Sequence, residues 1–212
     1  MKHSRISVLH VPGIGTLDHI RMAADMGAST IRIATHCTEA DISEQHIGMG
    51  SDLGMDTVGF LMMAHMIDEK AFLQQALLME SYGANCIYCT DSAGYMLPDE
   101  VTAKISTLRR ALKDETEIGF HGHHNLAMGV ANSLAAVRGG ACLVQGTANG
   151  VGERTGNANL NAIIGALALK GTQIAPEGIE VACSDNLHLL ADSARFVDET
   201  LNLIPRKSQP YV

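Results

Sequence analysis

Two histidines in the run Glu117–Asn125, which reads EIGFHGHHN, have the clearest potential for chemistry. If this run forms a β-strand, His121 and His123 lie on one face together with Gly119, because side chains alternate along a strand. Two imidazoles side by side at a strand end have the spacing of metal ligands, although hydrogen-bonded structural histidines would give the same pattern. We predict that His121 and His123 bind one divalent ion.

The segment Thr90–Gly94 places an acid and a hydroxyl at the expected end of another strand. Asp91 and Ser92 are small polar groups that could bind a substrate carboxylate or hydrogen-bond a neighbouring ligand. A turn that caps the following helix explains the same residues equally well. We take Asp91 and Ser92 as candidate catalytic residues, with Ser92 also a candidate for substrate binding.

A glycine-rich run, Gly150–Asn159, follows the last expected strand. Its glycines allow the backbone to fold closely around a ligand, although such runs are often only turns. Asn157 could supply an oxygen ligand to the metal, whereas Arg154 could pair with Glu153 or with a substrate carboxylate. We take Asn157 as a candidate metal ligand and Arg154 as a candidate substrate-binding residue.

A third histidine, His36, directly follows the earlier expected strand Thr30–Thr35. It shares a strand face with Arg32 and Ala34, so the alternation directs it toward the same pocket as the other polar strand ends. The carboxylates that follow it, Glu39 and Asp41, are better explained as solvated or capping groups. His36 is therefore a further candidate for ligand contact.

Composition disfavours three classes: nucleic-acid-binding, membrane-spanning and secreted proteins. The 212 residues carry a formal charge of −8 with dispersed Lys and Arg, which disfavours nucleic-acid binding. No apolar run reaches the roughly 20 residues of a membrane span, and the N-terminal 20 residues lack the apolar stretch of a secretory signal. Cys86 and Cys89 form a C-x-x-C, but strand residues three apart face opposite sides, which disfavours a metal or redox pair. We expect a cytoplasmic protein that acts on a small molecule.

Short β-rich runs alternate with amphipathic helical runs, which predicts a parallel sheet. The expected strands are Ile6–Val11, Thr30–Thr35, Thr57–Met63, Cys86–Asp91, Glu117–His123 and Cys142–Thr147. The expected helices are Leu17–Met26, Glu69–Tyr82, Pro98–Leu112 and Asn125–Arg138, most of them ending at a glycine (Gly27, Gly83, Gly139).

Polar residues recur at the C-terminal ends of these strands, which favours an α/β fold of the TIM (β/α)8-barrel type, because barrel active sites lie there. An open doubly wound sheet is the alternative, but no G-x-G-x-x-G follows the first strand. A closed barrel takes about 250 residues and eight strands, whereas six are expected here. We predict one domain over residues 1–212, an incomplete barrel without the two N-terminal βα units. Unpaired edges at Ile6–Val11 and Cys142–Thr147 predict a homo-oligomer.

These segments resemble the DRE-TIM metallolyase superfamily, the HMGL-like barrels that make or break carbon–carbon bonds next to a keto acid. The resemblance is carried by Val11–Gly15, Ile33–Asp41, Leu53–Met63 and the HGHHN run His121–Asn125. Within the superfamily these segments are most similar to 4-hydroxy-2-oxovalerate aldolases. Further along, Ala131–Val137 and Asn149–Ala158 look more like the Claisen-type synthases, such as 2-isopropylmalate and citramalate synthases, that condense acetyl-CoA with an oxoacid.

The resemblance implies a divalent cofactor, with Mn²⁺ ahead of Mg²⁺ or Zn²⁺. It implies that His121 and His123 hold this ion, that Asn157 completes its shell as in several relatives, and that Ser92 lies at the keto-acid site. The family's Arg-Asp strand, whose Asp binds the metal, is not found before Val11. The resemblance also implies an acylating aldehyde dehydrogenase as a partner, although the helical domain that docks it is absent because the chain stops at Val212.

The expected reaction is metal-dependent cleavage of a 4-hydroxy-2-oxo acid to pyruvate and an aldehyde, as in aromatic hydrocarbon catabolism, with Ser92, Asp91 and His36 as catalytic residues. Chelation of the substrate's carboxylate and 2-oxo oxygens would stabilise the enolate released when the C3–C4 bond breaks. Two other classes remain open. One is the acyl-CoA:2-oxoacid condensing synthase that the Gly150–Asn159 run suggests, and the other is a non-catalytic barrel fragment, which the missing Arg-Asp strand suggests.

Overall fold

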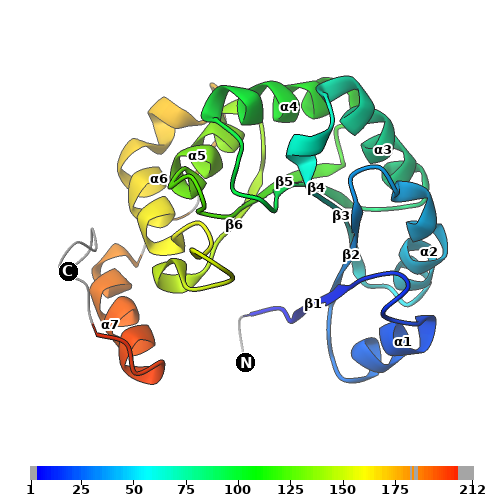
Figure 1. Ribbon diagram of the computed structural model, residues 1–212, viewed down its shortest axis with the longest axis horizontal. Coiled ribbons are helices and arrows are strands. Elements are labelled where there is room, and N and C mark those ends of the chain that lie inside the picture. Colours follow the sequence, from blue (N-terminus) through cyan, green and yellow to red (C-terminus); the bar gives the residue numbers. More distant parts are fainter. Residues whose placement is uncertain (1–3, 182, 184–185, 205–212) are drawn as a thin grey trace.

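Six parallel strands form the sheet in the computed structural model, which describes residues 4–181, 183 and 186–204. The strands are β1 (Ser7–His10), β2 (Thr30–His36), β3 (Asp56–Met62), β4 (Cys86–Asp91), β5 (Glu117–Gly122) and β6 (Leu143–Gln145). They pair in chain order from β1 to β6, and every pair is parallel. Figure 1 shows the sheet curled into an arc with helices along its convex side. This confirms the expected α/β fold, an incomplete (β/α) barrel.

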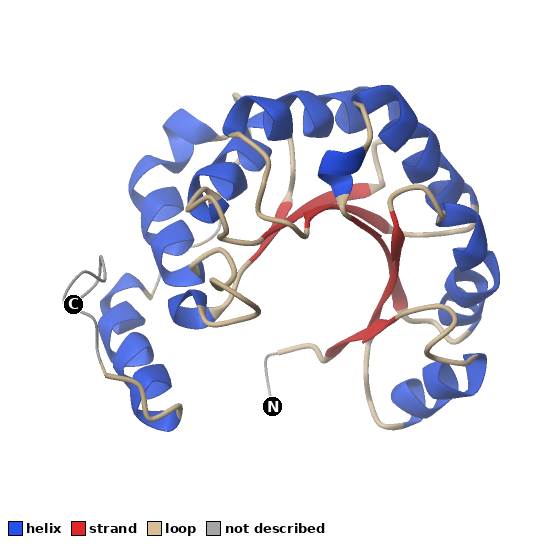
Figure 2. Ribbon diagram, viewed as in Figure 1, coloured by secondary structure: helices blue, strands red, loops and turns tan. Residues whose placement is uncertain are grey.

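Seven α-helices follow or connect these strands in the described residues: α1 (Leu17–Asp25), α2 (Glu44–Asp52), α3 (Glu69–Ser81), α4 (Pro98–Ala111), α5 (Gly129–Gly139), α6 (Leu160–Ile174) and α7 (Leu190–Thr200). Short 3-10 helices are η1 (Ala40–Ser43), η2 (Ala64–Met66), η3 (Ala148–Gly150) and η4 (Leu187–Leu189). The loops that follow β4, β5 and β6 bend over the concave side of the arc, as Figure 2 shows. In the described part of the chain no helix is both long and apolar enough to cross a membrane.

Most expected elements match the structure, and two differ for visible reasons. The sixth strand is shorter than the expected Cys142–Thr147, because the Thr147 N–H donates to the Ala158 carbonyl of the following loop at 3.1 Å. The expected helix Asn125–Arg138 begins only at Gly129, because Ala127 has a φ of 60°, which lies outside the helical region. Helices α2, α6 and α7 are not among the helices named from the sequence, and the two glycines of α2 weaken its helical signal.

Glycines end the helices much as expected. Gly27 and Gly83 have positive φ values of 90° and 102°, the left-handed conformation of a helix C-cap. After α5 this residue is Gly140, with a φ of 104°, and not the expected Gly139. Gly139 is instead the last residue of α5, where a Cβ would lie 3.0 Å from the Ile105 side chain of α4. It therefore permits close helix packing.

The two faces of the sheet differ in what they bury. The outer face and the helices share one large apolar cluster, which includes Ile33, Ile87 and Phe120. The inner face carries a small one: Ala34, Val58, Phe60, Cys86 and Tyr88. Cys86 and Cys89 therefore lie on opposite faces, as the alternation of strand side chains predicts.

Strands β1 and β6 are the two ends of the described sheet, and each pairs with one neighbour only. Side chains on these strands are partly accessible: Leu9 of β1 is 51% exposed and Leu143 of β6 is 38% exposed. An unpaired strand edge is a surface on which another strand can add. The expected open edges are therefore present, while the expected homo-oligomer stays a prediction.

Candidate active site

The predicted histidine pair converges at the C-terminal end of β5. His121 lies in the strand and His123 just after it, and their Nε2 atoms are 3.3 Å apart. Nitrogen ligands lie about 2.0–2.1 Å from an ion such as Zn²⁺, so a single ion can touch two nitrogens at this separation. The pair therefore fits a shared metal ion.

The environment of these imidazoles favours their neutral form. Burial, the neighbouring His123 and Arg32 lower the pKa of His121 to about 4. Burial and the positive charge of Arg154 lower the pKa of His123. Neutral imidazole is the form that donates its lone pair to a metal ion, so both rings are ready for ligation near neutral pH.

Asn157 is brought to the same place by the glycine-rich loop. Its backbone pairs with His123, and the next residue, Ala158, donates its N–H to the Gly122 carbonyl at 2.9 Å. The Asn157 amide raises the pKa of His121, which places it beside that ring. The Asn157 Oδ1 atom is buried without a hydrogen-bond partner among the described residues, as is His121 Nδ1. Buried polar atoms are normally paired, so this oxygen suits a ligand.

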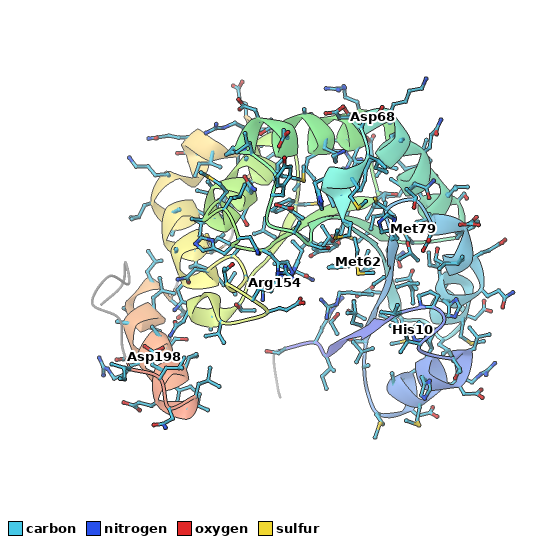
Figure 3. All side chains as sticks on the ribbon, viewed as in Figure 1. His10, Met62, Asp68, Met79, Arg154 and Asp198 are labelled. Atoms are coloured by element: carbon cyan, nitrogen blue, oxygen red, sulfur yellow. The ribbon has the colours of Figure 1, made fainter. Side chains whose placement is uncertain are left out.

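Arg154 connects the glycine-rich loop to the histidine pair. Its Nη1 pairs with Glu153 at 3.0 Å, and its Nη2 lies 3.0 Å from His123 Nδ1. Nη2 also donates to the Ser92 carbonyl oxygen, and Nε lies 3.5 Å from Asn125 Oδ1. Figure 3 shows Arg154 on the concave side of the arc. A guanidinium beside the predicted metal ligands is well placed to bind an anionic substrate group.

Ser92 and Asp91, at the end of β4, have different surroundings. The Ser92 hydroxyl accepts a hydrogen bond from the Met63 N–H at 3.1 Å, so its own proton can be donated elsewhere. The Asp91 carboxylate is fully buried and accepts from the N–H groups of Tyr95 and Met96, at 3.0 and 3.1 Å. Asp91 therefore shapes the turn before α4, the capping explanation of this motif, and its catalytic role stays a prediction.

His36 lies at the end of β2, away from this hydrogen-bonded group. Its Nδ1 atom hydrogen-bonds the Thr38 hydroxyl at 2.7 Å and lies 3.9 Å from the Cys37 sulfur. The structure thus brings Ser92, His121, His123, Arg154 and Asn157 together and leaves His36 with local partners. Its predicted contact with a ligand remains a prediction.

Two residues missing from the predicted site lie beneath His121 on the inner face. Gln145 of β6 is the strand partner of His121, and its side chain raises the pKa of that histidine. Arg32 of β2 donates from Nη1 to Gln145 Oε1 at 3.4 Å and lies over the Phe60 ring at 5.7 Å. The alternation of side chains gives the face of Arg32, but only the strand pairing shows that Gln145 adjoins His121.

One cavity is lined by members of this group, and another is lined by Asn125, a neighbour of Arg154. The first, of about 580 Å³, is lined by the Gly150–Asn157 loop, Asn159 and residues of and after α7, including Asp198. The other, of about 260 Å³, is lined by His65, Tyr95, Asn125 and neighbouring residues. The first cavity therefore gives space for a small molecule beside Arg154 and Asn157.

Comparison with known proteins identifies the family. The HMGL-like family model matches residues 1–197. A 4-hydroxy-2-oxovalerate aldolase of Pseudomonas putida is 60% identical over 173 residues, which are 82% of this chain and 50% of that protein. The aldolase of the same name from Shewanella woodyi is 65% identical over 160 residues, 76% of this chain and 47% of that protein. The chain thus spans about half the length of the curated relatives it matches.

Solved structures show the same fold at low sequence identity. The Bacillus subtilis HMG-CoA lyase superposes with a TM-score of 0.78 and 16% identity, covering 97% of this chain and 72% of the other. The N-terminal domain of a putative aldolase from Bacteroides vulgatus gives a TM-score of 0.74 and 20% identity, covering 95% and 65%. With the family match over residues 1–197, the chain belongs to the HMGL-like family.

Proposed function

We propose that this chain carries the metal and keto-acid site of a 4-hydroxy-2-oxo acid aldolase, which cleaves its substrate to pyruvate and an aldehyde. The observation that carries the proposal is the 3.3 Å distance between His121 Nε2 and His123 Nε2, beside Asn157 Oδ1, which has no hydrogen-bond partner among the described residues. Relatives with about 60% identity over most of this chain are named 4-hydroxy-2-oxovalerate aldolases. The chemistry of the side chains and these names point to the same reaction.

His121, His123 and Asn157 would hold the ion, with Mn²⁺ ahead of Mg²⁺ or Zn²⁺. When bound, it would supply Lewis acidity to the 2-oxo group of the substrate. Among the described residues no group of three or more His, Cys, Asp or Glu side chains could hold a metal. Two imidazoles and one amide oxygen carry no negative charge, so we expect the affinity for a hard dication to be weak.

The remaining residues position the substrate. Arg154 would bind the carboxylate; it would first leave Glu153, and that exposed ion pair contributes little stability. Ser92 would donate its hydroxyl proton to the bound keto acid, because its oxygen already accepts from the Met63 N–H. Breaking the C3–C4 bond requires a base to take the proton of the C4 hydroxyl, so that C4 becomes the aldehyde carbon. The electron pair of the broken bond forms the enolate of pyruvate, and protonation at C3 completes pyruvate.

A lactate-dehydrogenase-coupled assay with 4-hydroxy-2-oxopentanoate tests this reaction. Ser92→Ala should lower kcat/KM about 10- to 100-fold, as expected for one hydrogen bond to a charged group. Ser106→Ala is a matched control, because Ser106 donates to the Gly139 carbonyl in the outer layer. Activity that survives full chelation of divalent ions would contradict the metal mechanism, and equal losses in the two variants would contradict the role of Ser92.

Turnover by the chain alone should be low, because the three proposed ligands, His121, His123 and Asn157, include no carboxylate. Adding the first two βα units of a related aldolase in trans should increase pyruvate release and change the size-exclusion profile. Equal and measurable rates with and without these units would contradict the expected low turnover of the chain alone. No pyruvate from either mixture would favour a non-catalytic barrel.

The second candidate function is condensation of an acyl-CoA with a 2-oxo acid. It is favoured by the loop Gly150–Asn159, which resembles that of the condensing synthases and borders the 580 Å³ cavity. Incubation with pyruvate and acetyl-CoA separates the two functions, because only the synthase releases free CoA. We also propose a second copy of this chain and an acylating aldehyde dehydrogenase as partners, on the basis of the open strand edges and of the family resemblance respectively.

A further inference from the structure

A second pair of histidines lies between the sheet and the helices, away from the proposed active site. His10 is the last residue of β1, and His46 belongs to α2. Their ring centroids are 4.9 Å apart, close to the 5.2 Å between His121 and His123. Figure 3 shows His10 on the side of β1 that faces α1 and α2. No role in the proposed reaction accounts for this pair.

The His10 ring is buried and closely packed, but one of its nitrogens has no hydrogen-bond partner among the described residues. His10 is only 6% exposed, and its Nε2 atom is buried without a hydrogen-bond partner in the described part of the chain. His46 Nδ1 is in the same condition. The ring packs against Gly15 of the β1–α1 loop so closely that a Cβ at Gly15 would overlap it. Two neighbouring imidazoles thus each present an unused nitrogen in a confined space.

The chemistry of the pair favours a metal ion as the missing partner. Burial lowers the pKa of His10, as do His46 and His19, so the ring is neutral and has a lone pair to donate. An ion about 2.1 Å from a ring nitrogen lies roughly 3.2 Å from the ring centroid, so two rings on one ion have centroids about 5 Å apart. Imidazole suits Zn²⁺ and similar transition ions better than Mg²⁺ or Mn²⁺, which prefer oxygen.

We propose that His10 and His46 form a second metal site, selective for Zn²⁺-like ions, which ties the edge strand β1 to helix α2. Water completes the coordination. The tie acts on a strand of four residues that pairs only with β2 in the described sheet. Bound Zn²⁺ therefore ties β1, which has one paired edge in the described sheet, to a helix of the outer layer.

Calorimetric titration with Zn²⁺ tests this site in a chain whose first pair is removed by His121→Ala and His123→Ala. This background should bind about one equivalent of Zn²⁺. Adding His46→Ala should weaken the affinity at least about tenfold, the loss typical of disturbing a metal site. His188→Ala, at an exposed residue of η4, is the matched control and should change nothing. His46→Gln repeats the test with a side chain of similar size.

Hydrogen exchange supplies a second measurement that does not depend on catalysis. Zn²⁺ should slow exchange of the β1 amides in the background chain and leave them unchanged after His46→Ala. The proposal is overturned if the background binds no Zn²⁺, if His46→Ala and His46→Gln bind it as tightly as the background does, or if β1 is protected equally in their presence. Because none of these measurements involves pyruvate release, failure here leaves the proposed aldolase reaction untouched.

Discussion

The outer and inner faces of the sheet differ in the polarity of the side chains that they bury. The outer face packs apolar side chains such as Ile33 and Phe120 against the helices and buries them completely. The inner face has five buried apolar residues and, close to them, Arg32, His121 and Gln145. Several of its buried polar atoms lack partners among the described residues, including His121 Nδ1 and Arg32 Nε. Stability therefore comes mainly from the outer face, whereas the inner face keeps polar groups for a ligand.

The largest expected effect is on the free energy of unfolding, when a phenylalanine side chain is removed from the outer or from the inner face. Phe120→Ala should lower the free energy of unfolding by about 3–5 kcal/mol, because it empties a fully buried site in the outer cluster. Phe60→Ala should cost roughly half as much, because fewer apolar side chains surround Phe60 on the inner face. Urea unfolding of both variants measures the difference. Equal losses would mean that the two faces contribute alike to stability.

The second effect concerns the histidine pair itself. Replacing His121 and His123 together by alanine should weaken Mn²⁺ binding at least about a hundredfold, since both nitrogen ligands are lost. The free energy of unfolding should change by only about 1 kcal/mol, because the lost contacts are offset by removing His121 Nδ1, a buried nitrogen without a partner in the described part of the chain. Calorimetry and thermal unfolding provide the two values. Unchanged Mn²⁺ affinity would show that the pair is structural.

A smaller effect is expected from one methyl group in the loop. A Cβ at Gly152 would overlap the Asn157 side-chain amide, so Gly152→Ala should turn that amide away and weaken metal binding about tenfold. Gly165→Ala is the control: Gly165 lies in α6 with no atom near its added Cβ, and alanine there should stabilise the helix by about 0.5–1 kcal/mol. If Gly152→Ala binds Mn²⁺ as the parent chain does, Asn157 is not a ligand.

The smallest effect compares cysteines on the two faces. Burial raises the pKa of Cys89, on the outer face, to about 12, and raises that of Cys86 on the inner face as well. Both should react far more slowly with iodoacetamide at pH 8 than the exposed Cys142, because the thiolate is the reacting form. Peptide mass spectrometry measures the rates. Fast labelling of Cys86 alone would show that the inner face admits solvent.

The same thiols make stability depend on pH. They ionise near pH 8.5 in the unfolded chain but stay protonated in the folded one, so the stability they contribute is intact below that pH. As the pH rises above about 8.5, each thiol should cost the folded state roughly 1 kcal/mol per pH unit. Chemical unfolding between pH 8 and pH 10 measures this slope, and Cys86→Ala with Cys89→Ala should reduce it. An unchanged slope in that double variant would assign the effect to other groups.

The sequence allows much of the fold to be predicted, because strand periodicity survives in runs such as Glu117–Gly122. The alternation of side chains also places His121 and His123 on one face and separates Cys86 from Cys89. The alternation does not reveal that both carboxylate oxygens of Asp91 accept hydrogen bonds from backbone N–H groups, because these groups belong to the turn after the strand.

Long-range neighbours are the part that local patterns miss. Arg154 reaches the Ser92 carbonyl and His123 across the loop, and Gln145 meets His121 through strand pairing. The His10–His46 contact likewise joins the edge strand β1 to α2, a helix that was not expected from the sequence. These contacts depend on how the strands pair and on how the sheet curls, which local sequence patterns do not specify.

The strand order has a consequence for how the chain folds. Because β1 to β6 pair in chain order, each new strand closes a loop of only roughly 20 to 30 residues onto the strand before it, and the entropy of closing such loops is modest. The sheet can therefore grow by adding one βα unit at a time, and a chain emerging from the ribosome can begin folding before its C-terminal end is made.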